Sequence, residues 1–435
     1  MEARRLSPAA TGAAACRRRD DCRLCGGSAL ARVFALTPTP PANAFVPASG
    51  RDVPQACFPL EVFFCAACGH VQLRHVVDPR LLFENYVYVS GTSPMFVRHF
   101  EDYARAVLAR FRPASASLVV DIGSNDGTLL GFFQKGGMKV LGIDPARQIA
   151  AAASARGIET WADFFAPALA ARIRAERGPA AVITANNVFA HADDLPGVTE
   201  GVRALLAPDG VFVFEVSYLV DVYEKTLFDT VYHEHLAYHS VAPLVRFFAA
   251  HGLELFAAER VDSHGGSLRG FVQLKHGPRA VTPVGVHSHD GSIEALVALE
   301  KSLGLDKAET LAAYGRKIDG VRDSLRGLLL DLKSSGKRIA GFGAPAKATT
   351  LMYHFGLGPE LIEFIVDDSP LKQGLFTPGL HVPVLGPEAI DRRRPDYLLI
   401  LAWNFAKPIM ANHAGFAQSG GRFIVPLPHV EVYPS

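Results

Sequence analysis

The sequence has no cysteine after Cys68, no excess of charge of either sign and no long uninterrupted apolar run. Its 44 basic and 43 acidic residues leave a formal net charge of +1, so no chain-wide field favours nucleic acid or an anionic membrane as a partner. A helix that spans a bilayer needs about 18 or more consecutive apolar residues. We therefore expect no transmembrane helix, no membrane partner and no nucleic-acid partner.

Residues 1–19 are rich in alanine and arginine and lack the continuous apolar core of a secretory signal. Pro8 and Gly12 also interrupt any helix in this stretch. We interpret these residues as a flexible tail rather than a targeting peptide, and expect the protein to be cytoplasmic.

The cysteines are confined to the N-terminal part of the chain, whereas a disulfide framework would be spread through a small secreted protein. They are Cys16, Cys22, Cys25, Cys57, Cys65 and Cys68. Two pairs, Cys22/Cys25 and Cys65/Cys68, have C-x2-C spacing and are followed by glycine. Four thiolates at this spacing predict a closed tetrahedral zinc site, which would be structural, although a redox pair or idle thiols are the alternative. Cys16 and Cys57 receive no role.

Two stretches of the chain alternate short apolar strands with amphipathic helices. The first begins near Thr92 and has apolar segments at 118–122, 139–144, 180–185 and 210–216. The second follows a charge-patterned helical segment, 292–333, and has apolar segments at 338–343, 362–367 and 397–402. Because a β-α-β-α order produces parallel, doubly wound sheets, we predict an α/β protein with two Rossmann-like units.

The first strand of the first unit runs into a glycine turn at residues 121–127, and ligands of such folds bind at this edge of the sheet. Acidic residues flank the turn, so a pyrophosphate would be repelled, whereas the cationic S-adenosylmethionine (SAM) would be accepted. Asp144 ends the next strand, where a carboxylate can accept hydrogen bonds from ribose hydroxyls. Otherwise these residues are the glycine caps and solvated acids of any α/β unit. The expected cofactor contacts are Asp121, Gly123, Asn125, Gly127, Asp144, Asp163, Phe164 and Asn187.

A histidine-rich segment, Tyr232-His233-Glu234-His235-Leu236-Ala237-Tyr238-His239, follows the fourth predicted strand. It is not the H-E-x-x-H metalloprotease helix, because Ala237 occupies the place of the second histidine. A second metal at His235 and His239 and a structural polar cluster are alternatives. We favour general acid–base work, because histidine titrates near neutral pH and Glu234 can orient it.

The motifs, in this order, resemble those of the sugar C-methyltransferases of deoxysugar pathways, which methylate nucleotide-linked 4-keto-6-deoxyhexoses at C-3. The resemblance covers nearly the whole chain after the tail. It is carried by residues 68–73, 86–93, 121–127, 187–191, 232–235, 264–269 and 341–347. It implies that His235 is the base, that Tyr232 and Glu234 assist it, that His191 lies near the reacting centre and that Tyr86 or Tyr88 lines the sugar pocket. Gly91 and Phe189-Ala190 depart from the expected pattern, which affects substrate detail.

The second unit has its own glycine turn, Gly341-Phe342-Gly343-Ala344-Pro345-Ala346, which fits G-x-G-x-x-A. By pattern alone this turn predicts a dinucleotide site and a rival class, an NAD(P)-dependent sugar oxidoreductase. The resemblance instead implies that this unit helps to hold the nucleotide-sugar, with its diphosphate near the start of the following helix. The expected substrate contacts are His264, Gly265, Ser267 and Lys347.

Together these features predict four segments. They are a tail at 1–19, a zinc-binding module at 20–88, a Rossmann-like SAM-dependent methyltransferase domain at 89–282 and a C-terminal Rossmann-like domain at 283–435. The expected reaction is deprotonation of a carbon next to a ketone, followed by methyl transfer to that carbon of a nucleotide-linked sugar. A methyltransferase with a different small-molecule acceptor and a binding protein that has lost catalysis are the remaining alternatives.

Overall fold

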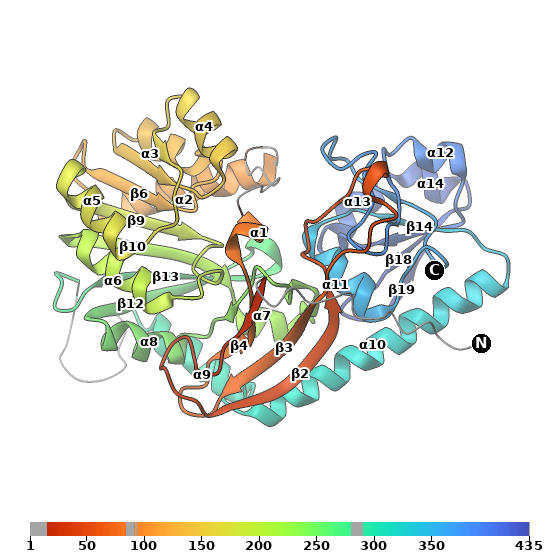
Figure 1. Ribbon diagram of the computed structural model, residues 1–435, viewed down its shortest axis with the longest axis horizontal. Coiled ribbons are helices and arrows are strands. Elements are labelled where there is room, and N and C mark those ends of the chain that lie inside the picture. The colour runs from red at the N-terminus through yellow and green to blue at the C-terminus, as the bar shows by residue number, and fades with distance from the viewer. Residues whose placement is uncertain (1–14, 84–90, 92–93, 280–289, 435) are drawn as a thin grey trace.

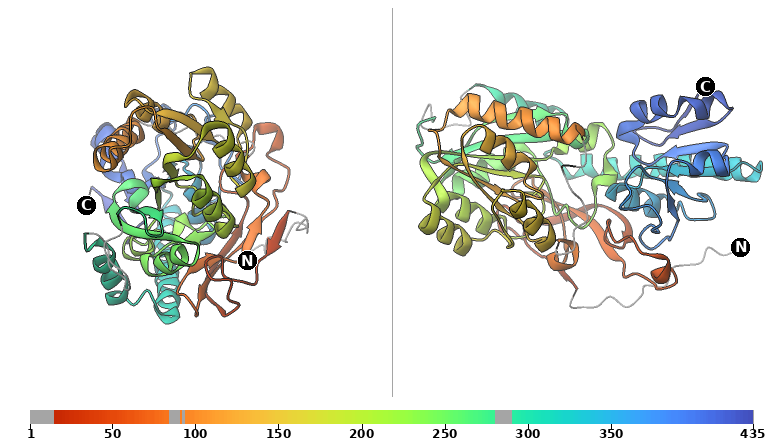
Figure 2. Two further views of the ribbon diagram at one scale, coloured as in Figure 1. Left: turned by 90° about the vertical axis from the view of Figure 1, so that its left-hand side faces the viewer. Right: turned by 90° about the horizontal axis from the view of Figure 1, so that it is seen from above.

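The computed structural model describes residues 15–83, 91, 94–279 and 290–434. Figure 1 shows two α/β units side by side, with strands β2 (Leu30–Thr39) and β3 (Phe58–Cys65) below their junction. The long helix α10 (Ala308–Ser334) runs beneath this junction and the C-terminal unit. The second view of Figure 2 separates the same two units and places the N-terminal strands along one side of them.

A seven-stranded sheet forms the first α/β unit, in the order β12-β13-β10-β9-β6-β7-β8. Its strands are β6 (Leu118–Ile122), β7 (Lys139–Ile143), β8 (Thr160–Trp161), β9 (Ala180–Asn186), β10 (Leu206–Ser217), β12 (Leu253–Val261) and β13 (Ser267–Leu274). Its helices are α2 (Pro94–Phe111), α3 (Thr128–Lys135), α4 (Arg147–Ala155), α5 (Pro167–Arg177), α6 (Leu195–Leu205), α7 (Leu219–Glu224) and α8 (Val241–Ala250).

The parallel part of this sheet matches the prediction, since β8, β7, β6, β9 and β10 run in one direction. Strands β12 and β13 are antiparallel additions at one edge. Because β6 has β7 on one side and β9 on the other, the strand order reverses at β6. A crevice opens at such a reversal, beyond the carboxyl ends of the strands.

The sheet of the N-terminal module includes one strand, β11, from the part of the chain that forms the first α/β unit. Its four-stranded sheet has the order β11-β4-β3-β2, and β1 pairs separately with β5. The remaining elements are β1 (Cys16–Arg18), β4 (Val71–Leu73), β5 (His75–Val77), α1 (Pro79–Phe83) and β11 (Ala237–Tyr238). In the antiparallel pair of β11 with β4, Ala237 lies opposite Gln72 and Tyr238 opposite Val71.

The tail expected over residues 1–19 needs a correction at its end. Residues 16–18 form β1 and pair with β5 in register, Cys16 opposite Val77. The physical reason is a small apolar cluster in which Cys16 packs against Phe58, Val77 and Leu82. Residues 1–14 lie outside the described residues.

A six-stranded sheet with the order β16-β15-β14-β17-β18-β19 forms the C-terminal unit, and only its edge strand β19 is antiparallel. Its strands are β14 (Ile339–Phe342), β15 (Ile365–Val366), β16 (Val384–Leu385), β17 (Tyr397–Ile400), β18 (Arg422–Val425) and β19 (Glu431–Tyr433). The helices after residue 290 are α9 (Ser292–Ser302), α10, α11 (Ala346–Phe355), α12 (Ala389–Arg393), α13 (Ala406–Asn412) and α14 (Ala414–Gln418). Short 3-10 turns occur at Ala48–Gly50, Phe228–Thr230, Ser263–Gly265 and Trp403–Phe405. This arrangement confirms the α/β class with two Rossmann-like units.

The divisions predicted at 88/89 and 282/283 fall within 84–90 and 280–289, which are outside the described residues. They therefore stay predictions. The helical segment expected over 292–333 is present as the two helices α9 and α10.

Helix α10 contacts both the N-terminal module and the first α/β unit. The hydroxyl of Tyr314 donates to the carbonyl of Val222 on α7 at 2.8 Å, and its ring meets Phe34 of β2 edge to face, with centroids 5.8 Å apart. The helix comes so close to β2 at Gly315 that a Cβ there would lie 2.6 Å from the Cβ of Phe34. Glycine at this position therefore permits the contact between the helix and the strand.

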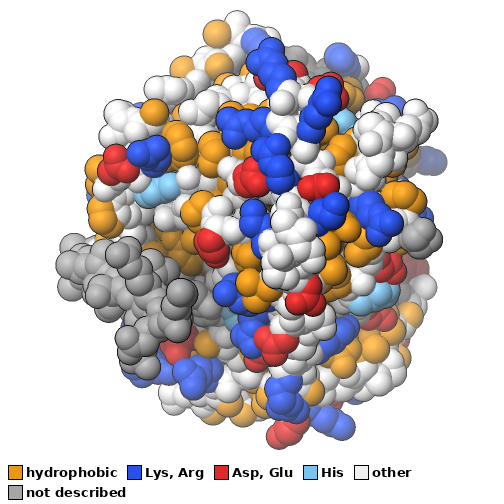
Figure 3. All heavy atoms as spheres, turned by 90° about the vertical axis from the view of Figure 1, so that its right-hand side faces the viewer, with side chains coloured by type: hydrophobic (Ala, Val, Ile, Leu, Met, Phe, Trp, Pro, Cys, Tyr) orange, Lys and Arg blue, Asp and Glu red, His pale blue; other side chains and the backbone are white. Residues whose placement is uncertain are grey.

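The outer face of the C-terminal unit is a mixture of basic and acidic side chains, as Figure 3 shows. Arg338 pairs with Glu363 at 2.9 Å and Lys337 with Asp396 at 3.4 Å on this unit. Of the helices in the part of the chain that the structure describes, none combines the length and the apolar character required to traverse a bilayer.

Replacing Gly315 with alanine should lower the stability of the protein. The new methyl group would press on the Cβ of Phe34, and overpacking of this kind costs about 1–3 kcal/mol, more than the ~1 kcal/mol that alanine gains over glycine in a helix. The urea midpoint of unfolding, followed by circular dichroism, should therefore fall.

Gly320→Ala in the same helix is the matched control, because a Cβ at Gly320 meets nothing within 4 Å. That variant should raise the midpoint. Equal shifts in the two variants would show that the approach of α10 to β2 does not depend on glycine.

Candidate active site and zinc site

The four knuckle cysteines converge on one point. Their ligand atoms all lie within 4.8 Å of one another, with Sγ–Sγ distances of 3.6 Å for Cys22 to Cys68 and for Cys25 to Cys65. Zinc–sulfur bonds of about 2.3 Å in a tetrahedron place sulfurs about 3.8 Å apart, so the four thiols fit zinc. Within the described residues no other group of three or more His, Cys, Asp or Glu is arranged to hold a metal.

Each knuckle is turned by the glycine that follows its second cysteine. Gly26 and Gly69 have φ values of +69° and +79°, and their N–H groups donate to the carbonyls of Cys22 and Cys65 at 2.9 and 2.7 Å. Left-handed φ values favour glycine, which explains the sequence pattern. Because four thiolates complete the tetrahedral shell, the zinc is structural.

Purified protein should contain about one zinc per chain, and Cys65→Ser should lose most of it because one of four ligands is gone. Cys57→Ser is the control, since the Cys57 Sγ lies apart from the cluster, 3.9 Å from the Tyr353 hydroxyl. Elemental analysis measures both. Full zinc in Cys65→Ser would contradict the four-cysteine site.

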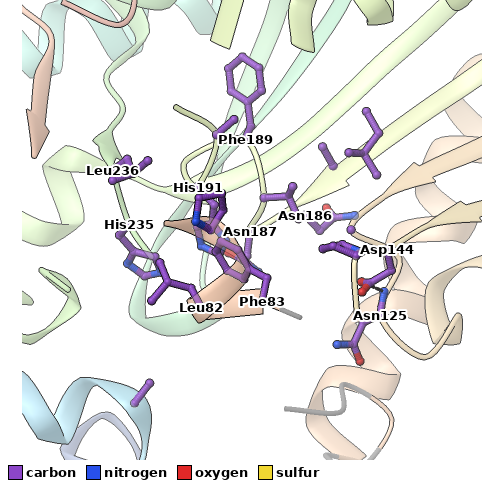
Figure 4. Close-up of a pocket in the computed structure, with 18 of the residues that line it drawn as sticks. Leu82, Phe83, Asn125, Asp144, Asn186, Asn187, Phe189, His191, His235 and Leu236 are labelled. Atoms are coloured by element: carbon purple, nitrogen blue, oxygen red, sulfur yellow. Dashed lines mark hydrogen bonds between the residues drawn. The ribbon is translucent and has the colours of Figure 1, made fainter. Parts of the chain in front are cut away.

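A cavity of about 990 Å³ lies where the two α/β units and the N-terminal module meet. Asp144 and Asn125 lie on one side of it and His191 and His235 on the other, with Asn187 between them, as Figure 4 shows. The N-terminal module contributes Asn43, Val76, Leu82 and Phe83, and the C-terminal unit contributes Lys347, Lys372 and Asn404.

The side of the cavity beside β6 has the form expected for the cofactor. Gly123 has a φ of +71°, and a Cβ there would lie 2.2 Å from Cγ2 of Val188, so glycine is required. The carboxylate of Asp144 accepts the N–H groups of Asn125 at 2.8 Å and Ala146 at 2.9 Å, which fixes its orientation. Gly127 also has a left-handed φ, +77°, and directly precedes α3, but it does not itself line the cavity.

The charge of this side also suits a cation. Burial raises the pKa of Asp121 to about 7, although the Thr184 hydroxyl, 2.6 Å away, acts in the opposite direction. Burial raises the pKa of Asp144 as well. A positively charged ligand stabilises the ionised form of such carboxyls, so the electrostatics of this side match the sulfonium and ammonium groups of SAM.

The other expected cofactor contacts also line the cavity. Asp163 and Phe164 follow β8 at its margin, and the Phe164 side chain is 40% exposed. Asn187 has a φ of +56°, and its N–H donates to the Glu215 carbonyl at 2.7 Å. Asn125, with a φ of +50°, lies in the glycine turn. The structure thus brings these predicted residues together around one space.

The opposite side of the cavity carries two histidines. The rings of His191 and His235 stack with centroids 5.0 Å apart and planes inclined by 21°. The ring of Tyr232 packs against that of His235, with centroids 4.1 Å apart. The ring of Phe83 stacks on that of His191, with centroids 5.6 Å apart. Glu234 is buried and accepts a hydrogen bond from the Asn43 side chain at 3.0 Å. Tyr86 and Tyr88 lie outside the described residues.

The two remaining histidines of the segment are buried, and of these His233 also borders the cavity. His233 bonds to the Phe58 carbonyl at 3.1 Å, and burial lowers its pKa to about 4. His239 stacks on Phe189 with centroids 5.5 Å apart, and burial lowers its pKa to about 4 as well. His235 lines the cavity whereas His239 does not, so this pair does not form a second metal site.

On the C-terminal side, Lys347 reaches the cavity from the first turn of α11. Its ammonium lies 3.5 Å from a carboxylate oxygen of Asp229 and 4.3 Å from the ring centre of Trp403. Burial lowers the pKa of Lys347, and Asp229 opposes this shift. Trp403 donates from its indole N–H to Asp229 at 2.6 Å. Lys347 is therefore a buried cation beside a space large enough for a ligand.

The acidic residue after the second strand of the C-terminal unit, Asp367, is placed differently from Asp144 with respect to the cavity. Asp367 follows β15 and uses its carboxylate oxygens to accept the N–H groups of Ala344 at 2.6 Å and Ser369 at 2.8 Å, as Asp144 does with Asn125 and Ala146. Asp367 does not line the cavity. The rival oxidoreductase interpretation gains no support from this arrangement.

Among the described side chains of the motif at residues 264–269, none lines the cavity. The Ser267 hydroxyl is fully buried and donates to the Ser263 carbonyl at 3.1 Å, and the Gly265 carbonyl accepts from Lys225 at 2.7 Å. A Cβ at Gly266 would lie 2.0 Å from Asp221, which accounts for a glycine in this turn. The side chain of His264 lies outside the described residues. A substrate role for this motif stays a prediction.

Sequence reasoning missed several residues of the cavity, among them Asn43, Phe83 and Asn404. Asn43 belongs to an irregular segment after two prolines and shows no periodic pattern. Phe83 ends the five-residue helix α1, too short to be recognised by its spacing. No motif marked these positions.

A glycine turn, an acidic second strand end and a cation-accepting cavity at the carboxyl edge of a doubly wound sheet define a SAM-dependent methyltransferase. Three family models match the chain in succession. Their descriptions are "Putative zinc binding domain" for residues 22–83, "Methyltransferase domain" for 96–258 and "C-methyltransferase C-terminal domain" for 262–428.

The chain is 36% identical to the C-methyltransferase NovU of Streptomyces niveus over 413 residues, 95% of this chain and 96% of the relative. The chain therefore belongs to the C-methyltransferase family, and the family relationship predicted from the sequence is confirmed. It is a SAM-dependent C-methyltransferase with a zinc-binding module.

Solved structures share a smaller part of the chain. The magnesium protoporphyrin IX methyltransferase ChlM of Synechocystis PCC 6803 with bound SAM is 14% identical, with a TM-score of 0.31 over 41% of this chain and 81% of that one. The CcbJ methyltransferase of Streptomyces caelestis is 14% identical, with a TM-score of 0.32 over 40% of this chain and 89% of that one.

Asp144→Asn should weaken SAM binding by about 10- to 100-fold, because a hydrogen bond to a charged group contributes about 1.5–3 kcal/mol. Isothermal titration calorimetry measures the affinity. Asp209→Asn, at an exposed position of β10, is the control and should bind SAM as the parent does. Equal affinities in all three proteins would remove Asp144 from the cofactor site.

Proposed function

We propose that this C-methyltransferase methylates a carbon next to the ketone of a nucleotide-linked keto-deoxysugar, after His235 has removed a proton from that carbon. The observation that carries the proposal is the single cavity that joins the acidic cofactor side, the His191/His235 pair and Lys347. A sugar acceptor is also in keeping with the resemblance of the motifs to sugar C-methyltransferases.

The hydrogen bonding of His235 selects the nitrogen that acts as the base. Its Nδ1 lies 2.8 Å from the Thr230 carbonyl, which can only accept. Nδ1 therefore carries the proton in the neutral ring, and Nε2 is the nitrogen that takes a proton from substrate. Thr230 thereby holds the imidazole in the tautomer that general-base catalysis needs.

Removal of the proton leaves an enolate, whose oxygen requires hydrogen-bond donors. We assign this role to the Tyr232 hydroxyl and to His191, which both lie against the His235 ring. Glu234 and Asn43 hold the segment that carries Tyr232 and His235. SAM, when bound, supplies an electrophilic methyl group. The enolate carbon forms the new C–C bond as the methyl–sulfur bond breaks, and the proton remains on His235 until solvent takes it.

The C-terminal unit supplies the contact for the nucleotide part of the substrate. Pro345 precedes α11, whose N-terminal N–H groups and the Lys347 ammonium suit a diphosphate. Asp229 and Trp403 hold Lys347 at the cavity wall. The sugar would then extend from this wall toward the two histidines. A cytoplasmic location remains a prediction.

The decisive experiment offers a panel of nucleotide-linked 4-keto sugars with SAM and looks by mass spectrometry for the gain of one methylene. Substrate deuterated at the carbon next to the ketone should lose its label on methylation. Methylation of a non-sugar acceptor alone would contradict the proposal.

His235→Asn should lower kcat by about 10²- to 10⁴-fold, the range that general-base catalysis contributes, with SAM affinity unchanged. Initial rates of methylene gain measure kcat, and calorimetry measures binding. His251→Asn, at the end of α8, is the control and should keep the parent rate. A rate within about threefold of the parent in His235→Asn would demote His235 from base.

A further inference from the structure

We propose that Arg23 is a positioning residue that connects the zinc knuckle to the two segments carrying His191 and His235. The proposal rests on the proposed function, in which these two histidines act on the substrate. It adds a route by which the metal module sets the geometry of the active site.

Arg23 lies inside the first knuckle, directly after the zinc ligand Cys22. Its side chain is completely buried. Its N–H donates to the Gln72 side chain at 2.9 Å, and the amide of Gln72 donates to the Asp21 carbonyl at 3.0 Å. These contacts within the knuckle therefore fix the main chain of Arg23 and the direction in which its side chain leaves it.

The guanidinium reaches the loop that carries His191. Nε of Arg23 donates to Oδ1 of Asp193 at 3.0 Å, and Nη2 lies 3.0 Å from the same oxygen. Asp193 is two residues after His191 and directly precedes Asp194, whose carboxylate accepts the Gly197 N–H at 2.9 Å and caps α6. The C-terminal end of this loop is thus fixed by one ion pair and one helix cap.

Arg17 and Arg19 of the N-terminal module also contact Asp193. Arg19 donates to its carbonyl at 2.7 Å and to its carboxylate at 3.2 Å, and Arg17 pairs with the carboxylate. Of these three arginines, Arg23 is the one whose side chain is fully buried, whereas that of Arg17 is 61% exposed. A buried ion pair orients a loop more strongly than an exposed one, because solvent screening weakens the latter.

A second arm of Arg23 reaches the segment that carries His235. Its Nη1 donates to the Leu73 carbonyl at 2.5 Å, and the Leu73 N–H donates to the Leu236 carbonyl at 2.9 Å. The N–H groups of Leu236 and Ala237 both donate to the Ala190 carbonyl, at 2.9 and 3.1 Å. Arg23 is therefore joined to both histidine segments, which are also joined to each other.

Lysine at position 23 would keep the charge but lose the fork, so it cannot hold Asp193 and Leu73 together. Because small displacements of catalytic groups reduce rates by up to about 10²-fold, Arg23→Lys should lower kcat by about 10- to 100-fold. The KM for SAM should change by less than about twofold, since the cofactor side is untouched. Zinc content should equal that of the parent.

A spectroscopic measurement tests the positioning without any substrate. In histidine-labelled protein, the ¹⁵N imidazole signals of His191 and His235, assigned from His→Gln variants, should move in Arg23→Lys. Asp193→Asn should move the His191 signal in the same way. In the double variant the loss of kcat should be smaller than the product of the two single losses, because both changes break the Arg23–Asp193 contact.

Arg246→Lys is the matched control. Arg246 donates to the Cys68 carbonyl of the other knuckle at 2.5 Å but contacts neither histidine segment. It should leave both the imidazole signals and kcat unchanged.

The outcomes separate this inference from the proposed function. If no keto sugar is methylated but the two imidazole signals move in Arg23→Lys and not in Arg246→Lys, the positioning role stands and the substrate proposal fails. Unmoved signals in a zinc-loaded Arg23→Lys protein overturn the positioning role whether or not sugars are methylated. Loss of zinc from that variant would show that Arg23 only maintains the zinc knuckle, and this result would also overturn the positioning role. If Arg23→Lys does not fold, Arg23→Gln decides by the same signals.

Discussion

The short pairing of β11 with β4 holds the active site together. Through it the sheet of the N-terminal module continues into a strand that begins two residues after His235, in the middle of the chain. The same stretch of backbone donates to Ala190, next to His191. Backbone hydrogen bonds between two strands restrict the direction of side chains close to them, here that of His235. The orientation that His235 needs as a general base therefore depends on two residue pairs that join separate units.

Burial divides His233, Glu234 and His235 of the histidine segment between two tasks. His233 and Glu234 are buried and fasten the segment to the N-terminal module through Phe58 and Asn43. His233 and His235 both border the cavity, but of the two only His235 is partly exposed. The depressed pKa of His233 means that this residue stays uncharged at neutral pH, so no buried charge disturbs the link. In this segment, His233 and Glu234 therefore hold the backbone in place, although their residue types suggest catalysis.

Much of the fold follows from the sequence because parallel, doubly buried strands are continuous apolar runs. The strands at 118–122 and 139–143 lie where such runs predict them, and the cysteine spacing predicts the metal cluster. The predicted strand at 362–367 is only two residues long, Ile365–Val366, although Glu363 and Phe364 before it also form backbone hydrogen bonds with β14. β11 has two residues and no periodicity, so local sequence could not predict it.

The contacts that complete the site could not be predicted for a related reason. Asn43 meets Glu234 and Arg23 meets Asp193 across more than 150 residues of chain, and neither pair carries a local signature. Isolated polar residues of this kind are indistinguishable from solvated surface residues until the topology is known. The glycine turn was recognisable because φ values such as that of Gly123 leave few alternatives to glycine.

The shared strand has a consequence for the order in which the chain folds during synthesis. All six cysteines leave the ribosome within the first 68 residues, so metal can gather the knuckles early. Strand β4 nevertheless lacks one neighbour until residues 237–238 have been made, and an unpaired edge of this kind invites incorrect pairing. The N-terminal module therefore reaches its final form only after most of the adjoining unit has emerged, and its maturation is tied to the completion of the catalytic segment.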